Sequence, residues 1–414
     1  MSTEGSNTIT RRVGATPPLL TNGEKAVTDP QLKYVCPATG QIFEDEKEFQ
    51  KHLKKLRVVE PNQIIKTLTL QPYIPGPPRS KEDLQKTYSA SDEITVKTWW
   101  NEWVKNKVSN FKNFKPADNT TMKDYGKYAY QPCIIAGSGP SLKQNAHHLK
   151  DRGDICLVST LHNFGYFEEQ GIKADYYLNL DAGDITIPEA AEGFADIYEA
   201  MKDFSPMNKI RYLDEVNFWK RTKGKTLVTC LHGNPELHKR WQGKILWFDT
   251  ALHGINEEVA KEAPDITGWN FIYQTGGNTL GACLYHARAV LGSSPIAFIG
   301  ADFCFQNSKF HAWNSPYDTQ CQGTMPCTTI HGERAETWPS YFGFKTWFEF
   351  IACGGLGNTP HSFVNCTEGG ILGAFPEGNI MQIRQRTLLE FIREYNLHKL
   401  LPGLLEGEKL MALF

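Results

Sequence analysis

From about residue 127 onward the chain alternates short apolar runs with polar or amphipathic segments. Several apolar runs carry hydrophobic side chains at consecutive positions, which is typical of strands buried on both faces. The intervening segments have helical spacing, so the pattern predicts parallel strands joined by helices. The predicted strands lie at 132–139, 154–160, 174–184, 225–233, 244–250 and 295–305, and the predicted helices at 141–153, 165–172 and 278–292.

This alternation predicts an α/β fold: a mostly parallel, Rossmann-like sheet with helices on both faces, over residues 126–380. Polar residues gather after Ala136, Leu180, Tyr273 and Gly300, each at the end of an apolar run. Ligands of such sheets bind at the carboxyl ends of the strands. The sequence therefore predicts a binding site at that edge, with residues 381–414 as a C-terminal helical segment.

The residues before the sheet have a different pattern. Residues 1–30 are rich in Ser, Thr, Gly and Pro and are predicted to be a disordered tail. Residues 31–125 form a small irregular or helical module, in which 70–84 is a Pro-rich extended linker. Residues 93–111 have tryptophans at helical spacing and predict a helix with an aromatic packing face.

Cys36 and His52 resemble half of a zinc finger. A zinc site needs four ligands, and the second cysteine and second histidine are missing, so zinc is disfavoured against a small hairpin and helix. The N-terminal module is a candidate element for recognising an acceptor.

Composition narrows the class of protein. The net charge of −2 over 414 residues gives no global attraction to nucleic acid or membrane. No apolar run approaches the ~20 residues that span a bilayer, and the first residues lack the apolar core of a secretory signal. The ten cysteines show no framework and predict free thiols. We expect a cytoplasmic protein, in a bacterium or in the host of a phage.

The segment "IIAGSGPSL" joins a predicted strand to a predicted helix. Glycines allow a tight turn and close approach of a ligand to the backbone, and Pro140 suits a first helical position. Ser138 and Ser141 can cap the helix or bond to phosphate oxygens. The loop lacks the lysine of a Walker A motif, so by itself it is either a phosphate loop or only a turn.

Three further groups of polar residues follow predicted strands. Asp181 and Asp184 either hold a divalent ion that bridges phosphates or cap the next helix. The second glycine loop, 274–282, offers hydroxyl and amide groups to a base or ribose. His311 and His331 follow the last long strand and are candidates for a general base or a phosphate-binding imidazole.

Six motifs in this order resemble the hydroxymethylpterin-diphosphokinase-like family: "IIAGSGPSL", "GIKADYYLNLD", "TGGNTLGACLYHARAVLG", "IAFIGADFCF", "HGERAET" and "VNCTEGGILG". That family includes the archaeal hydroxymethyl-dihydropterin diphosphokinase and the motility-associated-factor glycosyltransferases that modify flagellin. The first and fourth motifs also resemble bacterial sialyltransferases that use CMP-sialic acid. The resemblance covers residues 130 to 375.

The resemblance implies a set of site residues. Nucleotide contacts fall on two glycine loops and a closing segment, with Asp181 in the same pocket and Asp181 and Asp184 as candidate Mg²⁺ ligands. A histidine acts on the acceptor hydroxyl or the leaving phosphate; His331 is preferred and His311 is second. "Gly277-Asn278" stands where relatives vary, which leaves the donor open. The implied catalytic residues are His331, His311 and Asp302, and the implied nucleotide contacts are Gly137, Ser138, Gly139, Pro140, Ser141, Asp181, Thr275, Gly276, Gly277, Asn278, Asn365, Thr367, Glu368 and Gly369.

Three functions follow. The first is a glycosyltransferase that uses a nucleotide sugar, CMP-linked or other, with or without Mg²⁺, on a protein, glycan or modified nucleobase. The second is an Mg²⁺-dependent diphosphokinase that transfers diphosphate from ATP to hydroxymethyl-dihydropterin or a related alcohol. The third is a non-catalytic interaction protein of the same fold. The first is preferred, because a pterin kinase has little need for residues 1–125.

Overall fold

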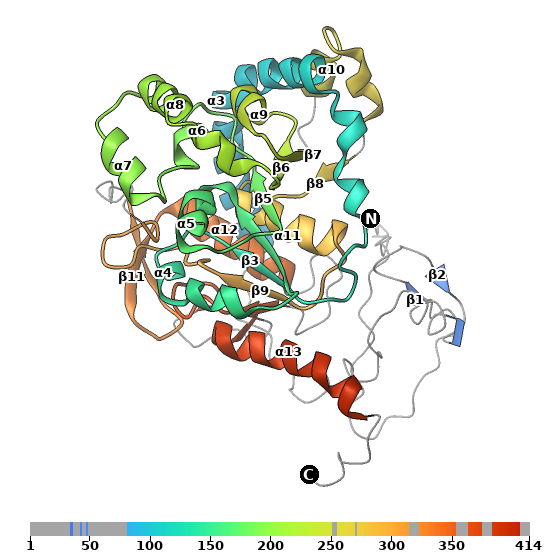
Figure 1. Cartoon of the computed structure of the whole chain (residues 1–414), viewed down its shortest axis with the longest axis vertical. Helices are drawn as coiled ribbons and strands as arrows, with labels where there is room; N and C mark the ends of the chain where they lie inside the picture. Colours follow the sequence, from blue (N-terminus) through green and yellow to red (C-terminus); the bar gives the residue numbers. More distant parts are fainter. Residues whose placement is uncertain are drawn as a thin grey trace, which may run out of the picture.

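A nine-stranded sheet organises the computed structural model, which describes residues 34–35, 42–43, 47–48, 81–250, 255–269, 271–313, 323–352, 363–374 and 383–405. The strand order is β13-β12-β9-β3-β4-β5-β6-β7-β8, and every neighbouring pair is parallel. The predicted α/β fold is therefore confirmed (Figure 1). The strands are β3 (Cys133–Ala136), β4 (Cys156–Thr160), β5 (Tyr176–Asn179), β6 (Thr226–Cys230), β7 (Lys244–Thr250), β8 (Ile272–Tyr273), β9 (Ile296–Ile299), β12 (Phe363–Asn365) and β13 (Ile383–Gln385).

Two hydrophobic layers bury the two faces of this sheet. Alternate residues of β3 divide between them: Ile134 and Ala136 face one layer, and Cys133 and Ile135 face the other. The central strands β3, β4, β5 and β9 are buried along their whole length, which is the physical reason for their unbroken apolar runs. The first layer holds α4 (Leu142–Asn145), α5 (Phe164–Gln170), α6 (Thr186–Glu189), α7 (Ala195–Met201), α8 (Pro206–Glu215), α9 (Pro235–Arg240) and α13 (Leu388–Leu405); the second holds α11 (Thr279–Tyr285) and α12 (Pro339–Phe350).

The long helix α3 (Lys81–Phe114) packs with α10 (Ile255–Val259) over the end of β7, around Val108, Trp247 and Trp269. Figure 1 shows α3 and α10 at one side of the view and α13 at the opposite side. The predicted tryptophan face takes part in this packing through Trp100 and Trp103. The end of the predicted linker, from Lys81, is helical rather than extended.

The predicted domain boundaries stay a prediction. The sheet itself runs on to β13, beyond residue 380, and residues 106–110 of the predicted N-terminal module contact the ends of β6 and β7. Residues 1–30, Cys36 and His52 lie outside the described residues. Two antiparallel pairs stand apart from the sheet: β1 (Tyr34–Val35) with β2 (Ile42–Phe43), and β10 (Met325–Thr328) with β11 (Arg334–Thr337).

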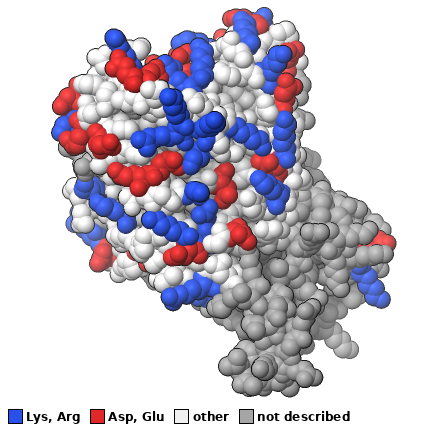
Figure 2. All heavy atoms as spheres, in the orientation of Figure 1, with Lys and Arg blue, Asp and Glu red and all other residues white. Residues whose placement is uncertain are grey.

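The described cysteines are all free, as predicted for that part of the chain. None of the helices in the described ranges has the length and apolar character needed to cross a bilayer. On the described face in Figure 2, Lys and Arg side chains are interspersed with Asp and Glu, so no field of one sign covers it.

Candidate functional site

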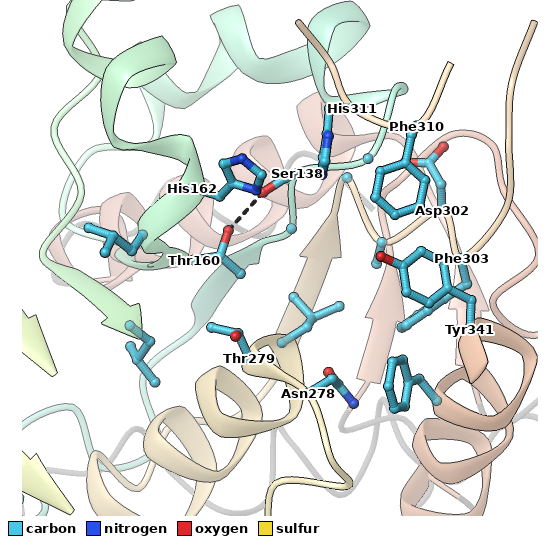
Figure 3. Close-up of a pocket in the computed structure, with 18 of the residues that line it drawn as sticks. Ser138, Thr160, His162, Asn278, Thr279, Asp302, Phe303, Phe310, His311 and Tyr341 are labelled. Carbon is cyan, nitrogen blue, oxygen red and sulfur yellow. Dashed lines mark hydrogen bonds between the residues drawn. The ribbon is translucent and has the colours of Figure 1, made fainter. Parts of the chain in front are cut away.

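A cavity of about 370 Å³ opens where the strand order reverses, between β3 and β9. Folds of this kind bind ligands at such a switch point, beyond the carboxyl ends of the strands. Figure 3 shows Ser138, Thr160 and His162 on one wall, His311, Asp302, Phe310, Phe303 and Tyr341 on another, and Asn278 and Thr279 at the mouth of α11. A cavity therefore lies where the sequence predicted the binding site.

The first glycine loop is shaped by close packing against the loop after β9. A Cβ atom on Gly137 would lie 2.5 Å from the carbonyl oxygen of Gly300, and one on Gly139 would lie 2.0 Å from the Asp302 carboxylate. Only glycine fits at these two positions. The Gly137 and Gly139 amides already donate to the carbonyl oxygens of Ile299 and Gly300. Both glycines line the cavity, but their N–H groups are engaged by protein rather than offered to a phosphate.

The rest of this loop divides between the cavity and its support. Ser138 lines the cavity, and its Oγ lies 2.9 Å from Oγ1 of Thr160 (Figure 3). Pro140 lines a neighbouring cavity instead. Ser141 is fully buried, and α4 behind it is only one turn long. The predicted helix 141–153 thus begins as α4 and continues as a 3-10 helix, Ala146–Asp151, so it offers no long helix dipole to a phosphate.

Asp302 lies beneath the loop, 1% exposed, and lines the cavity. Its Oδ2 accepts a hydrogen bond from Ser141 Oγ at 2.8 Å, and its Oδ1 accepts one from Gln306 Nε2 at 2.5 Å. Burial raises the pKa of Asp302 to about 7, against the opposing effect of the hydrogen bonds from Ser141. Near neutral pH this carboxyl group can therefore give or accept a proton.

Two histidines meet at the wall of the cavity, with ring centroids 4.5 Å apart. Burial, reinforced by the charge of the neighbouring His162, lowers the pKa of His311 well below its ordinary value. Burial also acts to lower the pKa of His162, but Glu189, Glu192 and Asp181 outweigh it and the pKa is raised. The two pKa values are therefore shifted in opposite directions: the surroundings favour the protonated form at His162 and the neutral form at His311.

His162 was not among the predicted site residues. The apolar run 154–160 predicts its strand, and Thr160 and His162 stand at the carboxyl end of that strand. The polar residues after this strand are the signal by which His162 could have been identified from the sequence. Glu189, Thr279, Phe310 and Tyr341 are further lining residues without a predicted role.

The acidic pair after β5 separates in the structure. Asp181 lines the cavity, and its Oδ2 accepts a hydrogen bond from Thr279 Oγ1 at 3.4 Å. Asp184 does not line it, and its Oδ1 accepts from Asn234 Nδ2 at 2.9 Å. Mg²⁺ is commonly held by one or two carboxylates plus substrate oxygens, so Asp181 fits such an ion and Asp184 does not join it there.

The second glycine loop brings half of its predicted residues to the cavity. Gly277 and Asn278 line it, while Thr275 and Gly276 do not. A Cβ atom on Gly276 would lie 2.3 Å from the ring of Trp347, so this glycine serves close packing. Asn278 caps α11, because its Oδ1 accepts from the Gly281 amide at 2.8 Å.

The predicted closing segment supports the site from behind and does not line the cavity. Asn365 Nδ2 donates to the Leu372 carbonyl, and Thr367 Oγ1 accepts from the Ala301 amide at 3.2 Å. Glu368 Oε1 accepts from Asn145 Nδ2 and from the Leu388 amide, and a Cβ atom on Gly369 would meet Gln306.

His331, the preferred catalytic histidine, is exposed and lies outside the cavity. Its Nε2 lies 3.3 Å from the carbonyl oxygen of Glu368. Of the two predicted histidines, the structure brings only His311 to the cavity.

The charge of the cavity is unusual for a nucleotide site. Its lining in the described part of the chain contains aspartate, glutamate and histidine but no lysine or arginine. The sequence of the undescribed segments between residues 251 and 382 contains none either. Phe310 and Tyr341 stack at 5.0 Å and 17° on one wall and offer an aromatic surface.

A second cluster of ligand-type residues lies under α3: Cys230, His232 and Asp249, whose ligand atoms are within 4.8 Å of one another. Lys107 Nζ contacts Asp249 Oδ1 at 2.7 Å, and both side chains are fully buried. His232 bonds to the Leu180 carbonyl at 3.1 Å and to Cys230 Sγ at 3.1 Å. The ammonium group of Lys107 already supplies the positive charge that a metal would bring.

The fold and the cavity define a Rossmann-like α/β protein with a polar site at the switch point of its sheet. The chain matches the family described as 6-hydroxymethylpterin diphosphokinase MptE-like over residues 102–308, which is half of its length. It belongs to that family, as the sequence motifs predicted, and this membership supports a transferase-like role. The match includes 102–125 and ends before His311, whereas the expected resemblance ran from 130 to 375.

Among solved structures, the chain is similar to the MAf glycosyltransferase from Magnetospirillum magneticum AMB-1, with a TM-score of 0.44 and 14% identity. The similarity covers 72% of this chain and 41% of that protein, so the chain spans well under half of its length. A likeness at this level says nothing about substrates. No curated protein matches the chain.

Proposed function

We propose that the chain is a glycosyltransferase whose donor is a sugar linked to a nucleoside monophosphate, such as a CMP-sugar. The observation that carries this proposal is the cavity lining: hydroxyl, amide, carboxyl and imidazole groups without a lysine or arginine in the described part. A triphosphate brings about four negative charges and is held by lysine, arginine and metal ions in phosphoryl-transfer enzymes. A donor with one phosphate carries one charge and places less demand on cations.

In this proposal His311 is the general base. Its lowered pKa favours the neutral form, and a neutral imidazole has a ring nitrogen that can accept the proton of an acceptor hydroxyl. The hydroxyl oxygen bonds to the anomeric carbon as the bond from that carbon to the phosphate oxygen breaks, and the nucleotide leaves as the monophosphate. The hydroxyls of Ser138 and Thr160 bond to each other, and the one that accepts in this bond can donate its own hydrogen to the leaving phosphate. Asp302, with a pKa of about 7, supplies a second proton-exchanging group.

The diphosphokinase remains the alternative, and the family membership is the observation that favours it. Transfer of diphosphate from ATP would need Mg²⁺ held at Asp181, because the described lining offers no other counter-charge. The two functions therefore differ in their dependence on metal and in the number of phosphates bound.

A thermal-shift series with CMP, UDP, GDP and ATP, with and without Mg²⁺, tests this difference. We expect CMP to raise the melting temperature without Mg²⁺. Stabilisation by ATP only with Mg²⁺, and AMP release that depends on hydroxymethyl-dihydropterin, would establish the alternative. Absence of any nucleotide effect would indicate the non-catalytic function.

Hydrolysis of the nucleotide sugar then tests the base. His311→Ala should lower turnover by roughly 10²- to 10⁴-fold, while His331→Ala, the matched histidine outside the cavity, should leave it near the wild-type rate. Equal losses in both variants, or a loss only in His331→Ala, would remove His311 from the proposed role.

A further inference from the structure

A second cavity, of about 470 Å³, adjoins the first. It lies between the start of α4, the helix α5, residues 192–199 and the segment 306–313. His311 lines both cavities, so its imidazole stands at their junction.

Two residues that line this second cavity each have one buried polar atom without a hydrogen-bond partner among the described residues. They are Oε1 of Glu192, whose residue is 2% exposed, and Nε1 of Trp313, whose residue is 8% exposed. A polar group that is buried without a hydrogen-bond partner destabilises the folded protein. One unmet acceptor and one unmet donor in the same wall are the complement of a hydroxyl-bearing ligand, which can both donate and accept.

Glu192 also connects the second cavity to the first. Its other carboxylate oxygen, Oε2, lies 3.4 Å from Nε2 of His162, which lines the first cavity. The ring of His162 in turn contacts the ring of His311. A hydroxyl bonded to Glu192 Oε1 would therefore lie beside the pair of histidines, His162 and His311.

The remaining lining indicates the class of ligand. Trp313 and Tyr166 present neighbouring rings, with centroids 5.8 Å apart and tilted by 30°. Aromatic rings pack against the apolar C–H faces of a sugar ring, and side-chain amides bond to its hydroxyls. Amide groups are supplied by Gln144, Gln170, Gln306 and Asn307.

The charges in this cavity are mixed. Lys143 and Lys309 are set against Glu169, Glu192 and Glu199. A nucleic acid would need a surplus of positive charge along its phosphates, and the surplus here is negative. A neutral ligand with many hydroxyl groups can hydrogen-bond to both the lysines and the glutamates.

We infer that the second cavity is the acceptor site of the proposed glycosyltransferase and that it takes a carbohydrate. The acceptor sugar packs on Trp313, one of its hydroxyls bonds to Glu192, and the reacting hydroxyl reaches His311 at the junction with the donor cavity. This inference rests on the proposed function for the donor, but the binding of a saccharide can be measured without it.

Saturation-transfer NMR on the whole chain with galactose, N-acetylglucosamine and lactose, and separately with a Ser/Thr-containing peptide, provides the test. We expect a saccharide signal and none from the peptide. Trp313→Phe, which keeps a ring and removes the N–H donor, and Glu192→Gln should each weaken saccharide binding by roughly three- to tenfold. Trp313→Ala should weaken it by at least about tenfold, and the exposed Glu257→Gln on α10 serves as the control that keeps wild-type binding.

The outcomes separate the two proposals. Binding of CMP with peptide but without any saccharide, or saccharide binding that is unchanged in both Trp313→Phe and Glu192→Gln, overturns the carbohydrate site and leaves the donor proposal standing. Saccharide binding that depends on Trp313 and Glu192 supports the site even where no nucleotide binds, and in that case the glycosyltransferase function fails alone. Far-UV circular dichroism of each variant checks that it is folded.

Discussion

Two clusters of histidine and carboxylate lie at the carboxyl ends of strands in the same sheet, and they are in opposite states. Under α3, Asp249 has a lysine ammonium group at 2.7 Å and His232 has a partner for each ring nitrogen. At the switch point, Asp302 and His311 face a cavity instead. The first cluster is complete without a ligand, and the second lines the space for one.

The difference comes from what covers the strand ends. Helix α3 places Asn106, Lys107 and Asn110 over the ends of β6 and β7. Asn106 donates to the carbonyl oxygen of His232, Lys107 donates to Asp249, and Asn110 donates to the carbonyl oxygens of Leu231 and Gly233. The ends of β3 and β9 border the cavity instead. Histidine and carboxylate residues at a strand end therefore indicate a ligand site only when it is known whether another part of the chain covers them.

Removal of the covering charge should have the largest effect on stability. Lys107→Met leaves the Asp249 carboxylate buried without its counter-charge, which should lower the free energy of unfolding by about 3 to 5 kcal/mol. Urea denaturation followed by tryptophan fluorescence measures the change. The double variant Lys107→Met/Asp249→Asn removes both charges and should recover most of the loss; a loss below about 1 kcal/mol in the single variant would show that the cluster is not sealed as described.

The cluster at the switch point, which contains Asp302 and His311, should instead make stability depend on pH. The pKa of Asp302 is about 7 in the folded chain against an ordinary value of 3.8, so between these values the folded state binds more protons than the unfolded state. This group therefore stabilises the fold at low pH, and its contribution falls as pH rises from about 4 to 7, by up to about 1.4 kcal/mol per pH unit.

The variant Asp302→Asn cannot titrate and should flatten that part of the pH profile. Unfolding curves at intervals between pH 4 and pH 8 give the comparison, and Glu257→Gln, at an exposed position on α10, is the control. Parallel profiles for wild type and Asp302→Asn would show that Asp302 is ionised throughout and has no proton-exchanging role at neutral pH.

The fold was largely predictable because burial on both faces leaves a direct trace in the sequence. The strands at 133–136, 156–160 and 296–299 are unbroken apolar runs, and their polar ends mark the edge where the cavity opens. The order of the strands in the sheet leaves no such pattern in the sequence. The placement of β9 beside β3, which creates the switch point, follows from how the helices pack on the two faces.

The position of the cavity was predictable from the sequence, and its lining residues only in part. Motif residues such as Gly276 and Thr367 meet the same spacing rules as lining residues, yet they serve packing and backbone support. His331 and His311 are alike in sequence terms, and only tertiary packing places one at the cavity and the other in solvent. His162 was missed because the residues after its strand contain one histidine and no glycine loop.

The smallest expected effect comes from the same helix that seals the first cluster. Lys112 Nζ lies 2.8 Å from Glu262 Oε2, nearly the same separation as in the buried pair, but the two side chains are 51% and 64% exposed. In water the attraction between such charges is weak and is opposed by the entropy of ordering two long side chains, so Lys112→Ala should cost less than about 1 kcal/mol.

Urea denaturation of Lys112→Ala and Lys107→Met at low and high salt measures the contrast between the two pairs. The Lys112→Ala difference should shrink further at 1 M NaCl while the Lys107→Met difference persists, because salt screens exposed charges far more than buried ones; equal costs in the two variants would mean that burial under α3 is not what makes the Lys107 pair strong.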